Sequence, residues 1–265
     1  MRFRLLGSLT VSDEAGGRIP LARPKHRQLL ATLLLDANRD VSVDRLVDHL
    51  WDGTAPRSAV GMIRTYVWQL RRLLAPRDPA TAPLRSRGAT YRIDVAPADV
   101  DLLVFLDLVG RGRDALADGR AREADALLRR ALDMWRGEAL QDVPLSRNLG
   151  IPAGRLEDER LSAFEGWADA RLALGRHQDV VQPLWHTIRR EPLREGLWGR
   201  LMLALHRGGR RADALQAFRQ LRRNLVAEIG VEPARELWEL QQAILADAPD
   251  LRAPGPGSPA RVDRR

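Results

Sequence analysis

Apolar residues and glycines in the second half of the chain recur at an interval of 34 residues. The matching pairs are Phe164 and Trp198, Trp167 and Leu201, Gly175 and Gly209, Val180 and Ala214, and Leu184 and Phe218. A period of this length indicates stacked supersecondary units, because one unit cannot bury its apolar face alone. The spacing therefore predicts successive helix–turn–helix pairs, each turning at its glycine.

The order of large, small and glycine positions is typical of tetratricopeptide repeats, and Pro192 falls where such a repeat ends. A third copy is predicted earlier, with Leu108, Gly119, Ala124 and Leu128 in the corresponding places. Residues 137–155, rich in Gly and Pro, separate this copy from the other two. An unrelated array of helical hairpins would also show some of this agreement, and this remains the alternative.

The first half of the chain predicts a small α+β domain that ends in a basic helix and a hairpin. Residues 2–12 alternate as a strand, Gly16 and Gly17 form a turn, and residues 19–21 form a second strand. One helix opens at Pro24 and ends near Asn38, and a second is N-capped by Ser42 and closes at Trp51. Residues 84–95 form two short strands around Gly88.

The helix at residues 64–74 has one apolar and one basic face. Ile63, Val67, Leu70 and Leu74 recur at steps of four, three and four residues and form the apolar stripe. The opposite stripe consists of Gly61, Arg64, Thr65, Trp68, Arg71 and Arg72. Strands, three helices and a basic hairpin follow the order of a winged helix, whose third helix enters the major groove of DNA.

The charge distribution favours a polyanion as the partner of the N-terminal domain. Residues 57–92 hold eight arginines and a single acid, Asp78. Residues 1–98 contain 16 basic and 9 acidic residues, whereas residues 99–265 contain 27 and 26, which accounts for net charges of +7 and +1. The 42 arginines and one lysine also suit a GC-rich genome, and a solvated helix face is the plainer alternative. Base composition alone would not confine the excess charge to one end.

The chain also resembles a known family along residues 1–246. The similar runs are PKHRQLLATLLLDANRDVSVDRLVDHLWDGTAPRSAVGMIRTYVWQLRRLL and GATYRIDV, followed by LALGRHQDVVQPL, REPLREGLWGRLMLALHRGGRRADALQAF and AEIGVEPARELWELQQAIL. In this order they resemble the OmpR-type DNA-binding domain and the bacterial transcriptional activation domain of the Streptomyces antibiotic regulatory protein family.

The resemblance implies an α+β winged helix-turn-helix domain followed by an all-α, tetratricopeptide-like domain. We expect the DNA-binding domain at residues 1–96 and the activation domain at residues 99–246. The Pro- and Gly-rich residues 247–265 are expected to be a disordered tail.

By the same resemblance, the function is that of a sequence-specific activator, specific for one secondary-metabolite (antibiotic) gene cluster. In this family two protomers bind direct repeats head to tail, so a dimer is expected on tandem elements about 10 to 11 base pairs apart. RNA polymerase holoenzyme is the further partner, with the loop at residues 52–58 as a candidate contact surface.

The predicted DNA-binding residues lie on the third helix, the hairpin and the loop before the helix. Arginine can bond guanine or phosphate in two places, threonine can meet a thymine methyl or a phosphate, and tryptophan offers apolar contact. The candidates are Arg57, Arg64, Thr65, Trp68, Arg71, Arg72, Arg85 and Arg87. Arg57 and Lys25 are expected near helix starts, where they can touch phosphate, although Arg57 can equally belong to the loop surface. Trp68 departs from the small polar residue that the family more often has, and it either alters the preferred sequence or packs against the hairpin.

Enzyme and membrane classes are not indicated. The chain has no cysteine, and the five histidines have no metal-ligand spacing, so neither a metal nor another cofactor is expected. Lys25 follows no glycine-rich loop, and no serine sits in a nucleophile elbow, so no catalytic residue is predicted. No signal peptide or spanning segment is evident, and a cytoplasmic location is expected.

A second reading, outside the activator class, remains open. A tetratricopeptide-like scaffold could carry a basic domain that binds nucleic acid without sequence preference. Both readings predict affinity that falls with salt, but only the activator should prefer a cognate site by roughly a thousandfold or more.

Overall fold

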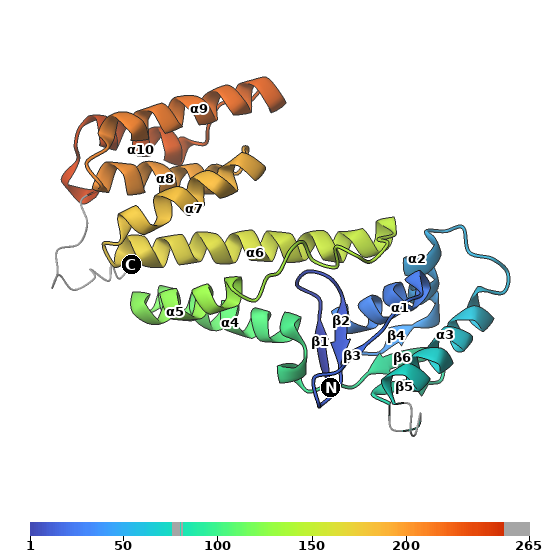
Figure 1. The fold of residues 1–265 in the computed structure, drawn as a ribbon. Coiled ribbons are helices and arrows are strands. Elements are labelled where there is room, and N and C mark those ends of the chain that lie inside the picture. Colours follow the sequence, from blue (N-terminus) through green and yellow to red (C-terminus); the bar gives the residue numbers. More distant parts are fainter. Residues whose placement is uncertain (76–79, 81, 252–265) are drawn as a thin grey trace. The chain divides into compact units, whose positions relative to one another are not determined.

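The computed structural model describes residues 1–75, 80 and 82–251, and these form two compact units (Figure 1). The first unit comprises Met1–Val109 and Arg130–Leu161, and the second comprises Gly110–Arg129 and Ser162–Arg265 as far as it is described. The first unit thus holds the whole predicted DNA-binding domain together with residues that follow it in the chain. The predicted boundary between residues 96 and 99 stays a prediction.

The N-terminal sheet has three antiparallel strands in the order β1-β2-β3. They are β1 (Arg2–Arg4), β2 (Thr10–Ser12) and β3 (Arg18–Ile19). The single strand expected at residues 2–12 is wrong, because the chain reverses between β1 and β2. Gly7 has φ +127°, a conformation that L side chains rarely adopt, and a Cβ there would lie 3.1 Å from the Cβ of Arg136.

The winged helix itself consists of three helices and a second three-stranded sheet, in the order β4-β6-β5. The helices are α1 (Pro24–Leu35), α2 (Val43–Trp51) and α3 (Ala59–Leu74), and the strands are β4 (Val41–Ser42), β5 (Leu84–Arg87) and β6 (Thr90–Ile93). Ser42 caps α2 as predicted, because its hydroxyl accepts the Arg45 N–H at 3.2 Å. Strand β4, which pairs Val41 with Tyr91, was not predicted.

Residues beyond the winged helix complete the first unit. The short 3₁₀ helix η2 (Pro97–Asp99) leads into α4 (Asp101–Ala117), whose first carboxylate accepts the N–H groups of Leu5 and Leu6 at 2.7 and 3.2 Å. Asp142 likewise accepts the N–H of Leu9 at 2.8 Å, and its carboxylate forms an ion pair with Arg27. Buried N–H groups need acceptors, so these two carboxylates satisfy the open turn between β1 and β2.

The remaining helices make up the rest of the described chain. They are α5 (Ala121–Leu132), α6 (Arg147–Ala173), α7 (His177–Arg190), α8 (Glu195–Arg207), α9 (Arg211–Ile229) and α10 (Arg235–Leu245). Helix α6 begins at Arg147 and contains Pro152, so part of the Gly- and Pro-rich stretch expected to separate the repeats is helical.

The predicted repeat is seen in the second unit as helix pairs that turn at equivalent glycines. Gly119, Gly175 and Gly209 follow α4, α6 and α8 and have φ values of +73°, +74° and +76°. Most residues of the 34-residue pattern are buried, whereas Phe164 is half-buried. Thus the spacing correctly predicted both the turns and the core of the helical domain.

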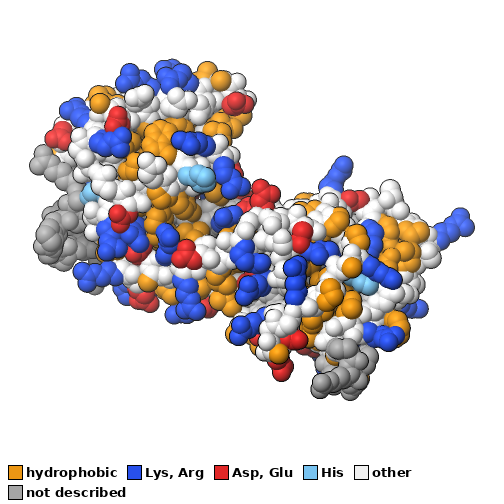
Figure 2. Space-filling view, viewed as in Figure 1, with side chains coloured by type: hydrophobic (Ala, Val, Ile, Leu, Met, Phe, Trp, Pro, Cys, Tyr) orange, Lys and Arg blue, Asp and Glu red, His pale blue; other side chains and the backbone are white. Residues whose placement is uncertain are grey.

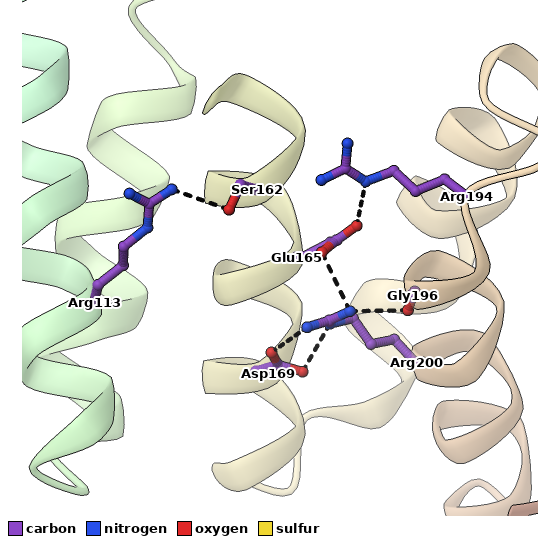
Figure 3. A network of polar contacts seen from close by, with 7 residues as sticks. All are labelled: Arg113, Ser162, Glu165, Asp169, Arg194, Gly196 and Arg200. Carbon is purple, nitrogen blue, oxygen red and sulfur yellow. Dashed lines mark hydrogen bonds and ion pairs between the residues drawn. The ribbon is translucent and has the colours of Figure 1, made fainter. Parts of the chain in front are cut away.

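Polar contacts hold α6 against α8 in this unit (Figure 3). Arg200 on α8 donates to both carboxylate oxygens of Asp169 on α6, at 2.8 and 2.6 Å. Glu165, one turn earlier on α6, accepts the Nε of Arg194 at 2.5 Å and lies 3.5 Å from Arg200. Such bidentate pairs fix the geometry of neighbouring helices as well as adding stability.

The predicted tail is described only in its first residues. Pro249–Leu251 form the 3₁₀ helix η3, and the Leu251 carbonyl accepts the Nε of Arg207 at 2.8 Å. Residues 252–265, for which disorder was predicted, lie outside the described residues, as does Asp78.

Candidate nucleic-acid interface

Helix α3 carries one buried and one exposed stripe. Ile63, Val67, Leu70 and Leu74 are each at most 3% exposed, which confirms the predicted apolar face. The opposite stripe is open to solvent and contains Gly61, Arg64, Thr65, Trp68 and Arg72. A Cβ on Gly61 would meet nothing within 4 Å, so no described part of the chain covers the helix at this position. Figure 2 shows Lys and Arg side chains standing out around α2 and α3.

Arg71 differs from its neighbours because its guanidinium is held against the hairpin. Its Nε donates to the Leu84 carbonyl at 3.0 Å, and its Nη2 donates to the Ser86 hydroxyl at 2.7 Å. The residue is half-buried. Arg71 therefore ties α3 to β5, a role that its place on the helical wheel did not predict.

Trp68 and Arg72 stack on each other on the exposed face of α3. The indole is 53% exposed, and the guanidinium carbon of Arg72 lies 4.9 Å from the ring centroid. Residues four apart on a helix are neighbours, and an arginine over an indole is a favourable cation–π arrangement. The indole thus meets Arg72 on the exposed face, and both alternatives for Trp68 stay predictions.

Arg64 and Thr65 complete this face one turn earlier. Arg64 is exposed and has no hydrogen bond or ion pair with any described residue. The Thr65 hydroxyl donates to the Gly61 carbonyl at 3.1 Å, which leaves its methyl group and both lone pairs of its oxygen for other contacts. Arg64 is thus a free fork of donors on the open stripe.

The hairpin turns sharply between β5 and β6. Arg87 pairs with Thr90 across the turn, and Gly88 has φ +56°, which favours glycine. Arg87 is exposed and makes no side-chain bond within the described part of the chain. Arg85 is also exposed, but its Nη1 donates to the Ala80 carbonyl at 2.7 Å. The two predicted hairpin arginines therefore differ in their freedom to reach a partner.

Arg57 and Lys25 lie on the α1–α2 side of the domain in different settings. Arg57 is exposed in the loop before α3. The Lys25 ammonium donates to the Leu50 carbonyl and lies 5.2 Å from the centroid of the Trp51 ring. Burial lowers the pKa of Lys25, and the nearby Asp52 carboxylate opposes that shift. Lys25 thus closes the end of α2, and its contact with phosphate stays a prediction.

Two contacts that orient α3 were not foreseen. His26 on α1 is buried, and its Nε2 lies 2.7 Å from the Gln69 Oε1 on α3. The Tyr66 ring stands edge-on to His26 at 5.6 Å. Burial lowers the pKa of His26, while the bond to Gln69 acts in the opposite sense. No spacing in the sequence marks these residues, because their partners lie 40 and 43 positions away.

The loop between α2 and α3 is fixed at one end by Asp52. This residue has φ +49°, and its carboxylate accepts the N–H groups of Arg147 and Asn148 at 2.8 and 3.2 Å, which caps the start of α6. The Arg147 N–H, followed by other bonds from the same segment, lowers the pKa of Asp52. Asp52, which the sequence placed in a plain turn, is therefore also a helix cap.

Other kinds of site find no support in the described residues. They contain no group of three His, Cys, Asp or Glu side chains placed to hold a metal ion. None of their helices is long and apolar enough to cross a membrane.

Two family descriptions match the chain in the expected order. Residues 17–93 match the family described as transcriptional regulatory protein, C terminal, and residues 100–245 match the bacterial transcriptional activator domain. Together these segments cover α1 to α3, the hairpin and the helices α4 to α10 almost completely.

Individual relatives agree with this assignment. The regulatory protein DnrI of Streptomyces peucetius is 39% identical, over 98% of this chain and 97% of DnrI. The transcriptional regulator RedD of Streptomyces coelicolor is 34% identical, over 96% of this chain and 73% of RedD. The regulatory protein AfsR of the same species is 38% identical over 95% of this chain, which spans only 25% of AfsR.

A solved structure has the same fold. Mycobacterium tuberculosis EmbR, in complex with a low-affinity phosphopeptide, superposes with a TM-score of 0.86 at 34% sequence identity. The match covers 94% of this chain and 65% of EmbR. A winged helix-turn-helix domain followed by the helical activator domain, with relatives that are regulators throughout, shows that the chain belongs to the Streptomyces antibiotic regulatory protein family of transcriptional regulators.

Proposed function

We propose that this regulator is a sequence-specific DNA-binding activator of one antibiotic or other secondary-metabolite gene cluster. The observation that carries the proposal is the open basic stripe of α3, where Arg64 and Arg72 stand exposed beside Trp68 on a helix whose other face is buried. An α-helix fits the major groove, and unpaired arginine forks match the acceptors of guanine.

In this arrangement α3 lies in the major groove and the hairpin reaches the adjacent backbone or minor groove. Arg87, free at the turn, is the residue we assign to that second contact. Arg85 and Arg57 are assigned to phosphate contacts at the margin. Arg71 acts by holding β5 against α3, so that helix and hairpin meet the DNA in a fixed relation.

We further propose that two protomers bind direct repeats about one helical turn apart, and that the loop at residues 52–58 meets RNA polymerase. Family membership and the exposure of that loop support this. The cap that Asp52 places on α6 holds one end of the loop, which reduces the ordering that a partner would otherwise require. Because DNA and RNA polymerase are the proposed partners, we expect the protein to act in the cytoplasm.

The decisive test is binding of the purified protein to tiled duplexes from the promoters around its own gene. The measurement is made at physiological salt with competitor DNA, and any bound duplex is footprinted. Protection of tandem repeats beside a promoter is the expected result. Binding that competitor removes everywhere would instead support the scaffold reading, with nonspecific nucleic-acid contact.

A double variant tests the assignment of α3 as the recognition helix. Arg71→Ala combined with Arg72→Ala is expected to abolish operator binding, because it removes one reading side chain and the tether of the hairpin. The helical domain should keep its far-ultraviolet circular dichroism, since neither residue belongs to it. Unchanged operator binding would sink the recognition-helix assignment.

A further inference from the structure

We propose that Trp68 and Arg72 read two neighbouring base pairs as one unit, with Arg72 on a guanine and Trp68 on the C5-methyl group of the adjacent thymine. This inference rests on the proposed function, and it names the bases that this part of the site would select. Arg72 and Trp68 are here specificity-determining residues rather than general backbone contacts.

Two consecutive arginines of α3 have different surroundings. Arg71 donates hydrogen bonds to the Leu84 carbonyl and the Ser86 hydroxyl within the domain. Arg72, one position on, has no hydrogen bond or ion pair with a described residue, and its guanidinium rests on the Trp68 ring. Stacking occupies the flat face of a guanidinium and leaves its N–H edges free, so Arg72 keeps the bidentate fork that guanine O6 and N7 accept.

The Trp68 indole lies at a place where an apolar group is unexpected. A singly exposed apolar side chain needs no explanation on an ordinary surface. Trp68, however, stands at the centre of the exposed stripe of α3, beside the polar side chains of Arg64 and Thr65. The thymine methyl is the apolar group that the major groove offers, so a 53% exposed indole at this place matches it in chemistry.

The separation of the two side chains is close to one base step. The Arg72 guanidinium carbon and the Trp68 ring centroid are 4.9 Å apart. Successive bases of one strand are separated by about 3.4 Å along the helix axis. Two groups this close can meet base pairs one step apart, and the ring also restricts the rotamers of Arg72 before binding, which lowers the entropic cost of the guanine contact.

The test uses the full-length protein and the operator found by footprinting. Each thymine in the operator is replaced singly by uracil, which removes only the C5-methyl group, and affinity is measured for the wild type and for Trp68→Ala. At one thymine the wild type should lose roughly 4-fold in affinity, the value of one buried methyl group. Trp68→Ala should bind more weakly overall but be insensitive to uracil at that position, while uracil at the other thymines serves as the internal control.

Arg72 is tested on the neighbouring guanine. Its replacement by 7-deazaguanine removes one acceptor of the bidentate pair and should cost the wild type roughly tenfold in affinity but leave Arg72→Ala unaffected. Trp68→Phe should recover part of the uracil sensitivity, because it restores an apolar ring. The variants at Trp68 and Arg72 change exposed side chains, and a melting temperature equal to that of the wild type confirms that they fold.

The outcomes are separable. If sensitivity to uracil persists in Trp68→Ala, the methyl group is read by another residue such as Thr65, and the inference is overturned. The same holds if no uracil substitution affects the wild type more than the variant. If the wild type leaves no footprint on any promoter duplex, the proposed function itself fails, which is a different result from a footprint without methyl sensitivity.

Discussion

At the scale of single residues, equal charges on this surface have unequal roles. Arg71 and Arg85 are engaged inside the domain, whereas Arg64 and Arg87 are exposed without partners among the described residues. Counting arginines along the sequence could not separate them. Their partners are a hydroxyl and backbone carbonyls, which every sequence contains in abundance.

Arg87→Ala tests the hairpin contact. Loss of one phosphate contact should lower the slope of log affinity against log salt by about 0.9, and affinity should fall on all duplexes alike. Arg39→Ala is the matched control, because it removes the same charge from an exposed position next to Asn38, which bonds Ile93 at the other end of the hairpin. Equal salt slopes for the two variants would contradict the assignment of Arg87.

His26 gives stability a pH dependence of known sign. Burial holds the pKa of His26 below its ordinary value, so the folded protein resists a proton that the unfolded chain accepts. Stability contributed by the neutral ring is therefore complete above the ordinary histidine value, about 6.5, and is lost as pH falls below it. The pKa values of His49 and His177 are lowered in the same sense.

The measurement is urea unfolding at pH 7 and at about pH 5.5. The wild type should be less stable at the lower pH, and His26→Gln should show a smaller difference between the two. His186→Gln, at an exposed position, serves as the control. If His26→Gln showed the full pH dependence of the wild type, His26 would not contribute to the pH dependence of stability.

At the scale of elements, the glycines between paired helices were the most reliable guide in the sequence. Gly175 and Gly209 adopt positive φ 34 residues apart, as the period required, and Gly119 does so at the corresponding place of the earlier copy. The apolar stripe of α3 was also predictable, because burial of one helix face leaves a period of 3.6 in the chain. The strand at residues 2–12 was mispredicted, since alternation alone does not reveal a reversal at Gly7.

Gly209→Ala isolates the conformational cost of such a turn. Its φ is +76°, and a Cβ there would meet nothing within 4 Å, so the expected loss of about 1 to 2 kcal/mol comes from the backbone alone. Gly110→Ala is the counterpart, because Gly110 lies inside α4 with open space around it and the change should stabilise by up to about 1 kcal/mol. Thermal unfolding of both variants gives the sign, and a shared sign would disprove the turn argument.

At the scale of the whole molecule, the turn of the N-terminal sheet between β1 and β2 depends on acceptors from residues far along the chain. The N–H groups of Leu5 and Leu6 find their acceptor in Asp101, and that of Leu9 finds it in Asp142. Burial raises the pKa of Asp101 even though these bonds favour its charged form. Burial therefore disfavours the charged form of the Asp101 carboxylate, while the N–H groups of Leu5 and Leu6 use it as their acceptor.

Asp101→Ala should therefore destabilise the first unit by about 1 to 3 kcal/mol, the cost of leaving buried donors without an acceptor. Asp99→Ala is the control, since its carboxylate accepts no hydrogen bond from a described residue. Unfolding by urea, followed through hydrogen exchange of β1 and β2 amides, reports on the same unit. Indistinguishable stabilities for the two variants would show that the turn does not need Asp101.

The sequence determined the helical repeat, the two faces of α3, the helix cap at Ser42 and the concentration of positive charge in the first 98 residues. These features are local or periodic, so each leaves a pattern that can be counted along the chain. The tertiary structure determined which arginines are free, how His26 meets Gln69, and how Asp101 and Asp142 serve a turn 96 and 133 residues away. Such pairs arise from burial, which forces a polar group to take whichever partner the fold brings within reach, and no spacing in the sequence records that choice.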